Sequence, residues 1–161
     1  MCLVYGGASV GLMGTLADAV LDGGGDVVGI LPRWLEDREV GHSRLRELHI
    51  VDSMHARKQR MIERSDAFIA MPGGLGTFDE LFEVLTWAQI GLHEKPVGLL
   101  DIGGYFEPFR ALVRHAVKEG FVLAEHEGLF VSDPDPDNLI DALAAFERPT
   151  YGSKWVEKPA P

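Results

Sequence analysis

Apolar and amphipathic segments alternate along the whole chain. Short apolar runs typical of buried strands are separated by stretches with apolar residues at helical spacing. The predicted strands are 2–7, 26–32, 47–51, 66–71, 95–101 and 128–133. The predicted helices are 11–22, 53–64, 77–91, 105–120 and 136–146, with a polar, loop-like segment at 33–45 that could hold one short helical turn.

Strands that are apolar almost throughout indicate a parallel sheet covered by helices on both faces. The pattern therefore predicts an α/β protein with a Rossmann-like, doubly wound parallel sheet. We expect a single domain over residues 1–148 and an irregular tail at 149–161. In such folds, ligands bind outside the carboxyl ends of the strands.

Composition and charge narrow the classes of function. The 161 residues carry a net charge of −10, which disfavours nucleic acid as a partner because such binding depends on Lys and Arg. No apolar run approaches the roughly 18 residues of a membrane span, and the N-terminus lacks the basic region of a signal peptide. The single cysteine, Cys2, excludes a disulfide framework. We expect a cytoplasmic protein without a membrane partner.

Two predicted strand-to-helix turns are rich in glycine, "YGGASVGLMG" (5–14) and "MPGGLGTFDE" (71–80). Glycine permits positive φ and lets a ligand approach the backbone, while a helix start offers unpaired N–H groups to an anion. Each turn is therefore either a phosphate site or only a tight turn. Thr77 and Glu80 also have two interpretations: a capping box that begins the helix, or a carboxylate that acts beside a bound phosphate.

Basic residues are concentrated in "HARKQRMIER" (55–64), which makes up most of a predicted helix with Ser53 as its expected N-cap. Arg57 lies near its first turn, at the carboxyl end of the preceding strand, where a guanidinium can bind a phosphate or a purine edge. The alternative is a surface ion pair. Lys58 falls close to the apolar face, which suggests a buried partner. The histidines lack metal-ligand spacing, so no metal is expected.

Taken together, these motifs resemble those of the Lonely Guy family of cytokinin riboside 5′-monophosphate phosphoribohydrolases. The family signature PGGxGTxxE reads "PGGLGTFDE" at 72–80, and its MHxRK element reads "MHARK" at 54–58. The flanking segments "VYGG", "GLMG", "SDAFIAMPGG", "TWAQIG" and "KPVGLL" also match, from about Leu3 to Phe121. Members have often carried a lysine decarboxylase label, but no lysine site for pyridoxal phosphate is recognisable here.

The resemblance implies hydrolysis of the N-glycosidic bond of a nucleoside 5′-monophosphate, AMP or a cytokinin nucleotide, by a homodimer without a cofactor. By position, Arg57 and Glu80 are the implied catalytic residues. Gly6, Gly7 and Ser9 form a possible second glycine turn. The implied substrate-binding residues are Glu39, Met54, Lys58, Gly73, Gly74, Leu75, Gly76, Thr77, Phe78, Asp79 and Thr86.

One feature departs from the family pattern. Members usually have a further strand and helix before "LVYGG", and the first strand ends in a Gly-Ser turn that also faces the nucleotide. Here the resemblance begins at the second strand, which puts one wall of the site in doubt. The competing interpretation is a protein of the same fold that binds a nucleotide or cofactor without catalysis.

Overall fold

The structure is a computed structural model that describes residues 1–38 and 40–147. It consists of two compact units, Met1–Ser65 and Asp66–Pro161, which are considered separately. Glu39 and the predicted tail at 149–161 lie outside the described residues. No helix within the described part of the chain has the length and apolar character to cross a membrane.

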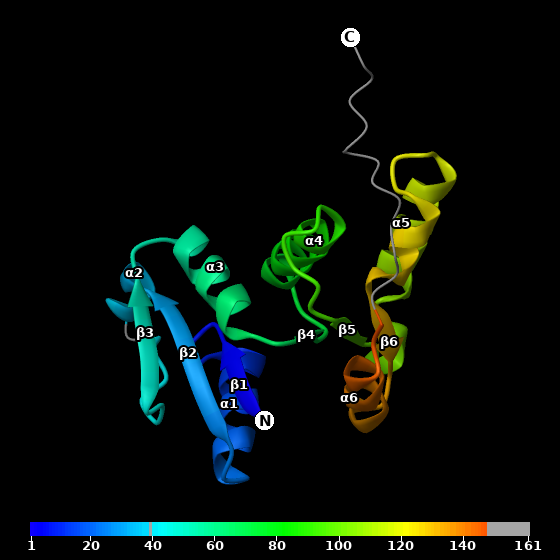
Figure 1. Ribbon diagram of the computed structural model, residues 1–161. Coiled ribbons are helices and arrows are strands. Elements are labelled where there is room, and N and C mark those ends of the chain that lie inside the picture. The colour runs from blue at the N-terminus through cyan, green and yellow to red at the C-terminus, as the bar shows by residue number, and fades with distance from the viewer. Residues whose placement is uncertain (39, 148–161) are drawn as a thin grey trace. The chain divides into compact units, whose positions relative to one another are not determined.

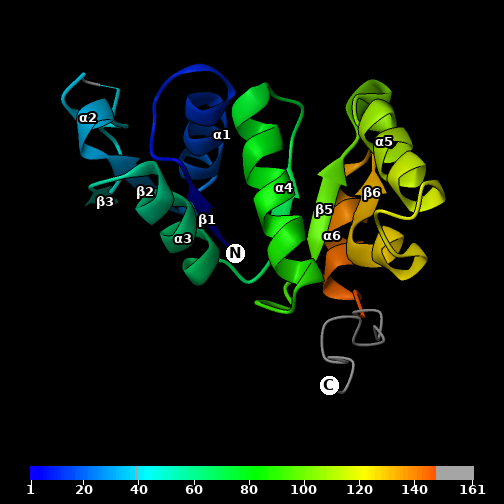
Figure 2. The ribbon, with the colours of Figure 1, turned by 90° about the horizontal axis from the view of Figure 1, so that it is seen from above.

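The first unit is a parallel three-stranded sheet with helices on both faces. Strands β1 (Cys2–Tyr5), β2 (Asp26–Pro32) and β3 (Glu47–Val51) lie in the order β1-β2-β3. Helices α1 (Gly11–Asp22) and α3 (Met54–Arg64) cover opposite faces, as Figures 1 and 2 show, and a short helix α2 (Arg33–Glu36) follows β2. Because the strands are parallel, their carboxyl ends share one edge, from which the loop after β1 and the segment leading to α3 depart.

Side-chain alternation explains the core of this unit. Tyr5 of β1, Val27 of β2 and Ala17 of α1 form one buried cluster on the face that α1 covers. Residues Ile30 and Leu31 of β2 are completely buried, as expected for the central strand of a sheet with helices on both sides. The apolar runs of the sequence therefore become strands because both of their faces are covered.

The second unit repeats this architecture. Strands β4 (Phe68–Ala70), β5 (Val97–Leu100) and β6 (Val131–Asp133) form a parallel sheet in the order β4-β5-β6. Its helices are α4 (Leu75–Gln89), α5 (Glu107–Lys118) and α6 (Pro136–Ala144), with short 3₁₀ helices η1 (Ile102–Gly104) and η2 (Ala124–Leu129). The prediction of an α/β protein with parallel strands is confirmed, whereas the single domain stays a prediction.

Close packing in this unit depends on one glycine and on a group of aromatic rings. A Cβ at Gly98 of β5 would lie 3.0 Å from Leu139 of α6, so the missing side chain lets α6 approach the sheet closely. The ring of Phe109 in α5 lies 5.4 Å from that of Phe82 in α4 and 5.6 Å from that of Phe130 before β6. These rings join the two helices to the strand.

Three sequence-based predictions need correction. Helix α4 begins at Leu75, two residues before the predicted start, and α5 begins at Glu107 rather than at residue 105. The segment at 66–71 was expected to be a buried strand, but Ile69 is 45% exposed. The reason is topological, because β4 is an edge strand of its sheet and has β5 as its neighbour.

Candidate functional site

The glycine loop of the second unit connects β4 directly to α4. Gly74 is the N-cap of α4, with φ −91° and ψ −157°. Its carbonyl accepts from the N–H groups of Thr77 (3.0 Å) and Phe78 (3.3 Å), which closes the first turn of the helix. The N–H groups of Gly74, Leu75 and Gly76 come before this first turn, so the hydrogen-bond ladder of the helix gives them no acceptor.

These three N–H groups are unpaired within the described part of the chain. The loop around them is open as well, since a Cβ on Gly74 or Gly76 would have no described atom within 4 Å and the side chain of Leu75 is 88% exposed. None of these glycines has positive φ, so of the two properties of glycine only the missing Cβ applies in this loop. Neither internal packing nor backbone conformation requires glycine at 74 and 76.

Gly73, in contrast, is required by its neighbours. A Cβ at Gly73 would lie 2.2 Å from Thr77 Oγ1, too close for any side chain. The carbonyl of Gly73 accepts a hydrogen bond from the hydroxyl of Tyr105, which follows η1 in the loop after β5. The ring of Tyr105 also stacks on Phe78, with 6.3 Å between the centroids and 10° between the planes. Thr77 and Tyr105 thus fix the loop at Gly73, just before the open glycine positions.

The expected capping box at Thr77 and Glu80 is wrong. Because α4 begins at Leu75, Thr77 is the third residue of the helix and Glu80 the sixth. A residue at the sixth position is too far along to receive a hydrogen bond from the N-cap N–H. Glu80 is half-buried in α4, whereas Asp79 and Thr86 of the same helix are exposed. Helix capping therefore does not explain the presence of a carboxylate at Glu80.

In the first unit, α3 carries Arg57 and is held at both of its ends. At its start, Ser53 is the N-cap, and its Oγ accepts from Ala56 N at 3.1 Å, as predicted. At its end, Arg64 Nη2 lies 2.6 Å from Glu47 Oε1 of β3. A hydrogen bond from His49, followed by the charge of Arg64, lowers the pKa of Glu47. The cap closes the first turn of α3, and the Arg64–Glu47 contact joins the end of the helix to β3.

Arg57 points toward the sheet and is buried, whereas the alternative explanation, a surface ion pair, places it at the surface. Its side chain is only 6% exposed, and Nε donates to the carbonyl of Ile30 at 3.2 Å. Nη1 lies 3.8 Å from the sulfur of Met54. A guanidinium is normally solvated, so a buried one requires specific partners. Met54 itself is 42% exposed at the first position of α3.

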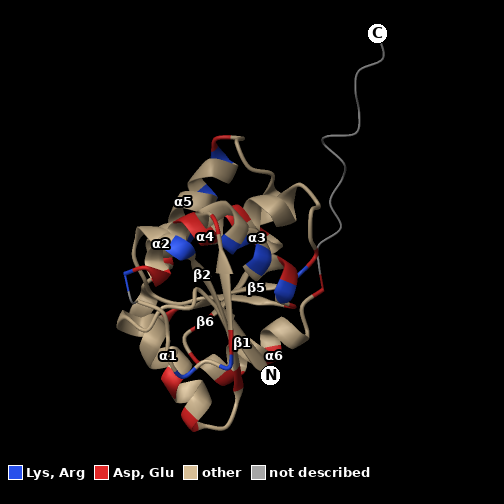
Figure 3. Cartoon of the chain, turned by 90° about the vertical axis from the view of Figure 1, so that its left-hand side faces the viewer, with Lys and Arg blue, Asp and Glu red and all other residues tan. Residues whose placement is uncertain are grey.

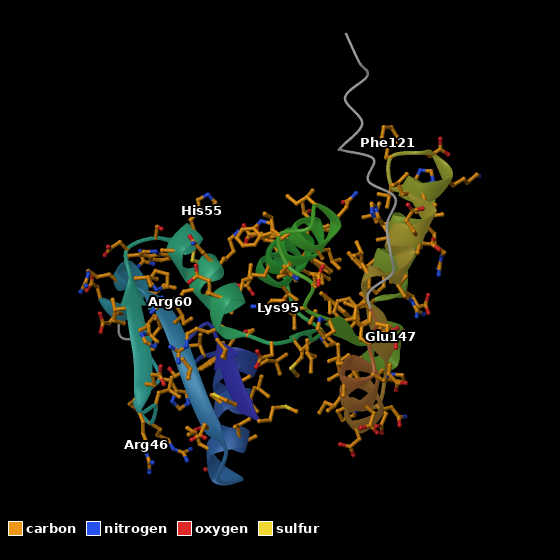
Figure 4. The ribbon with its side chains drawn as sticks, in the orientation of Figure 1. Arg46, His55, Arg60, Lys95, Phe121 and Glu147 are labelled. Atoms are coloured by element: carbon orange, nitrogen blue, oxygen red, sulfur yellow. The ribbon has the colours of Figure 1, made fainter. Side chains whose placement is uncertain are left out.

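Gly6, in the loop after β1, leaves space for the guanidinium of Arg57. A Cβ at Gly6 would lie 1.5 Å from Arg57 Nη2, so any other residue at position 6 would displace the arginine. The first glycine turn thus has an internal role that its sequence did not reveal. Figure 3 shows that Lys and Arg recur along α3, and Figure 4 shows that His55 in its first turn points away from the sheet. Lys58 in the next turn is half-buried.

The rest of the first glycine turn is also engaged within the unit. Gly7 adopts φ 75°, and its carbonyl accepts from His42 N at 3.0 Å. Ser9 is exposed, but both its N–H and its hydroxyl donate to the carbonyl of Val40, at 2.9 and 3.2 Å. Helix α1 begins only at Gly11, with Val10 as N-cap. This turn therefore differs from the open loop before α4.

Sequence reasoning missed Tyr105. The segment from residue 105 was interpreted as the start of a helix, so its first side chain received no role. The available signal was "IGGY" directly after an apolar strand, because Gly103 and Gly104 both adopt positive φ, 63° and 75°, and form a turn at the strand's carboxyl end.

Each of the two units offers chemical groups of its own. The loop before α4 presents unpaired N–H donors together with the positive end of a helix dipole, a combination that binds anions such as phosphate. The carboxylate of Glu80 follows in the same helix, and the first unit supplies the buried guanidinium of Arg57. The second unit can therefore bind an anion, and its carboxylate can stabilise a positive charge.

The chain matches a family model and several curated proteins. Residues 13–143 match a family model described as possible lysine decarboxylase. A probable cytokinin riboside 5′-monophosphate phosphoribohydrolase of Oryza sativa subsp. japonica is 50% identical over 144 residues, 89% of this chain and 63% of the relative. Another from the same organism, without "probable" in its name, is 48% identical over 97% of this chain and 65% of the relative.

A third relative, a cytokinin riboside 5′-monophosphate phosphoribohydrolase of Arabidopsis thaliana, is 45% identical over 161 residues, covering 97% of this chain and 71% of the relative. The chain spans about two thirds of the length of the curated relatives that it matches, 63% and 66% for the first two. The similarity nevertheless covers most of this chain, from 89% to 97% of it in these three comparisons.

The close contact between Gly6 and the guanidinium of Arg57 leads to a prediction about stability. Replacing Gly6 by Ala forces the guanidinium to move, and we expect the free energy of unfolding to fall by about 1–3 kcal/mol, the range for overpacking in a core. Urea denaturation measures the change. A matched control is Gly23→Ala at the end of α1, where the added Cβ would have its nearest contact at an ordinary 3.4 Å.

A double-mutant cycle separates the proposed clash from other causes. In an Arg57→Ala background the obstructing atoms are gone, so Gly6→Ala should lower the free energy of unfolding clearly less than it does in the wild type. An equal loss of unfolding free energy in both backgrounds would show that glycine is needed at position 6 for a reason other than space for Arg57.

Proposed function

This chain belongs to the Lonely Guy family, and we propose that it hydrolyses the N-glycosidic bond of a nucleoside 5′-monophosphate. Water adds to C1′ of the ribose while the bond from C1′ to the base nitrogen breaks. The electron pair of that bond goes to the base, which takes up a proton and leaves as a free adenine-type base. The other product is ribose 5-phosphate. The names of the relatives support this reaction, and lysine decarboxylation is not proposed.

The observation that carries the proposal is the open loop before α4. Its three unpaired N–H groups and its two unobstructed glycines suit the 5′-phosphate of the substrate. Binding the phosphate, which does not react, supplies energy that positions the glycosidic bond for attack. Gly73, Thr77, Phe78 and Asp79 belong to the same segment, and we assign them to substrate binding with Gly74, Leu75 and Gly76.

Glu80 and Arg57 are the residues to which we assign the chemistry. Breaking the bond builds positive charge on the ribose, and the carboxylate of Glu80 stabilises that charge or orients the attacking water. Negative charge moves onto the departing base, which a guanidinium such as Arg57 stabilises. Met54, Lys58 and Thr86 remain proposed substrate contacts, and so does Glu39, which itself lies outside the described residues.

We also propose a homodimer in the cytoplasm. Leu81, Leu85 and Ala88 of α4 are buried, yet Phe82 in the same helix and Ile90 at its C-cap are 44% and 51% exposed. A helix that is apolar on a second side is typical of one that contacts a partner. A reducing compartment suits a chain whose one cysteine is free and exposed.

The proposed role of the phosphate gives a first prediction. AMP or a cytokinin nucleotide should release free base with a kcat/KM at least about a hundredfold above that of the matching nucleoside, because the nucleoside leaves the loop donors without an anion. Chromatography of the base released from each compound measures the ratio. Similar values for AMP and adenosine would contradict phosphate recognition, and binding of AMP without any base release would favour the non-catalytic alternative.

The role of Glu80 gives a second prediction. Replacing Glu80 by Gln keeps the shape of the side chain and removes its charge, so base release should fall by about a thousandfold or more while AMP binding persists. Glu119→Gln, at the exposed end of α5, is the matched control. Because Glu80 is not a cap of α4, a large loss of thermal stability in Glu80→Gln with unchanged turnover would assign it a purely structural role.

The dimer gives a third prediction. Multi-angle light scattering at micromolar concentration should return a mass about twice the 17.7 kDa of one chain. The change Ile90→Glu places a charge on an exposed apolar side chain at the end of α4 and should shift the mass toward one chain, whereas Glu119→Gln should leave it unchanged. A wild-type mass near 17.7 kDa would contradict the dimer.

A further inference from the structure

We propose that Tyr105 is a positioning residue that sets the direction of the Gly74 N–H and thereby prepares the loop before α4 for phosphate. This inference rests on the proposed function, in which that loop holds the 5′-phosphate. It assigns a role to a side chain outside the signature motif, donated by a segment 32 residues further along the chain.

The segment that carries Tyr105 is itself firmly held. Asp101 follows β5, and its Oδ1 accepts from Phe106 N at 2.7 Å. Phe106 is completely buried, and Gly103 and Gly104 adopt positive φ, which turns the chain back after the strand. Tyr105 is itself 40% exposed, and it is presented by a tight turn with a buried anchor on its C-terminal side.

The geometry of the peptide bond connects this hydroxyl to the anion site. The carbonyl of Gly73 and the N–H of Gly74 belong to one planar, trans peptide group, so they point in opposite directions. The Tyr105 hydroxyl donates to that carbonyl and so holds the plane of the group. The N–H of Gly74 is then directed away from Tyr105, to the side where it has no described acceptor.

The need for such a restraint follows from the composition of the loop. Glycine has more backbone freedom than any other residue, and the peptide group between two glycines rotates easily. An anion that had to order this group on binding would lose affinity to conformational entropy. Tyr105 supplies the order in advance, and its ring, stacked on Phe78 of α4, keeps the hydroxyl in register with the helix.

Tyr105→Phe isolates the hydroxyl because the ring and its stacking on Phe78 remain. We expect the Kd for ribose 5-phosphate and for AMP to rise about fivefold, the effect of losing one hydrogen bond, with adenosine binding unchanged. In turnover, KM for AMP should rise by a similar factor, with kcat changing less than about twofold. Calorimetry gives the Kd values, and chromatography of the released base gives the kinetics.

The matched control is Thr15→Val, which removes another hydroxyl that donates to a main-chain carbonyl, that of Gly11 in α1 at 3.2 Å. It should leave every Kd unchanged. Equal weakening of AMP and adenosine in Tyr105→Phe, or no weakening of either, would overturn the inference. So would a wild type that binds neither AMP nor ribose 5-phosphate.

The experiment also separates this inference from the proposed reaction. A wild type that binds ribose 5-phosphate and loses affinity on Tyr105→Phe, yet releases no base from any nucleotide, would support the role of Tyr105 while refuting the hydrolysis. Base release by the wild type together with an unchanged KM for AMP in Tyr105→Phe would support the hydrolysis and overturn the role of Tyr105.

Discussion

The unpaired backbone N–H groups at the start of α4 are the constraint on which the candidate site of this protein depends. A backbone donor needs an acceptor, and a helix cannot supply one to its own first residues. In the described chain, Gly74, Leu75 and Gly76 meet that constraint by staying open to solvent. The neighbouring residues are arranged around this opening, with Gly73 held closely and the two following glycines left free.

Arg57 shows the opposite solution in the first unit. Its guanidinium is buried, so the fold must provide an acceptor and an unobstructed space, and these are the carbonyl of Ile30 and the bare backbone of Gly6. Burying a charged group without such partners would cost several kcal/mol. Apolar side chains often serve a buried position equally well, so the presence of an arginine here agrees with the chemical role proposed for Arg57.

The sequence predicted much of the fold because strand and helix alternate with clear apolar patterns. It predicted the cap at Ser53 as well, since capping is a local signal. It failed at the start of α4, because Thr77 and Glu80 have the spacing of a capping box and glycine has low helix propensity. The roles of Gly6 and Tyr105 depend on contacts with residues far away in the sequence, which no local pattern contains.

The central claim is that the N–H groups before α4 bind the phosphate of a nucleotide. The most direct measurement is an ¹⁵N–¹H NMR titration that follows the backbone amides of Gly74, Leu75 and Gly76. The account predicts large, saturable shifts of all three amides with AMP and with ribose 5-phosphate, and none with adenosine. Amides that do not respond to AMP, or that respond equally to adenosine, would contradict it.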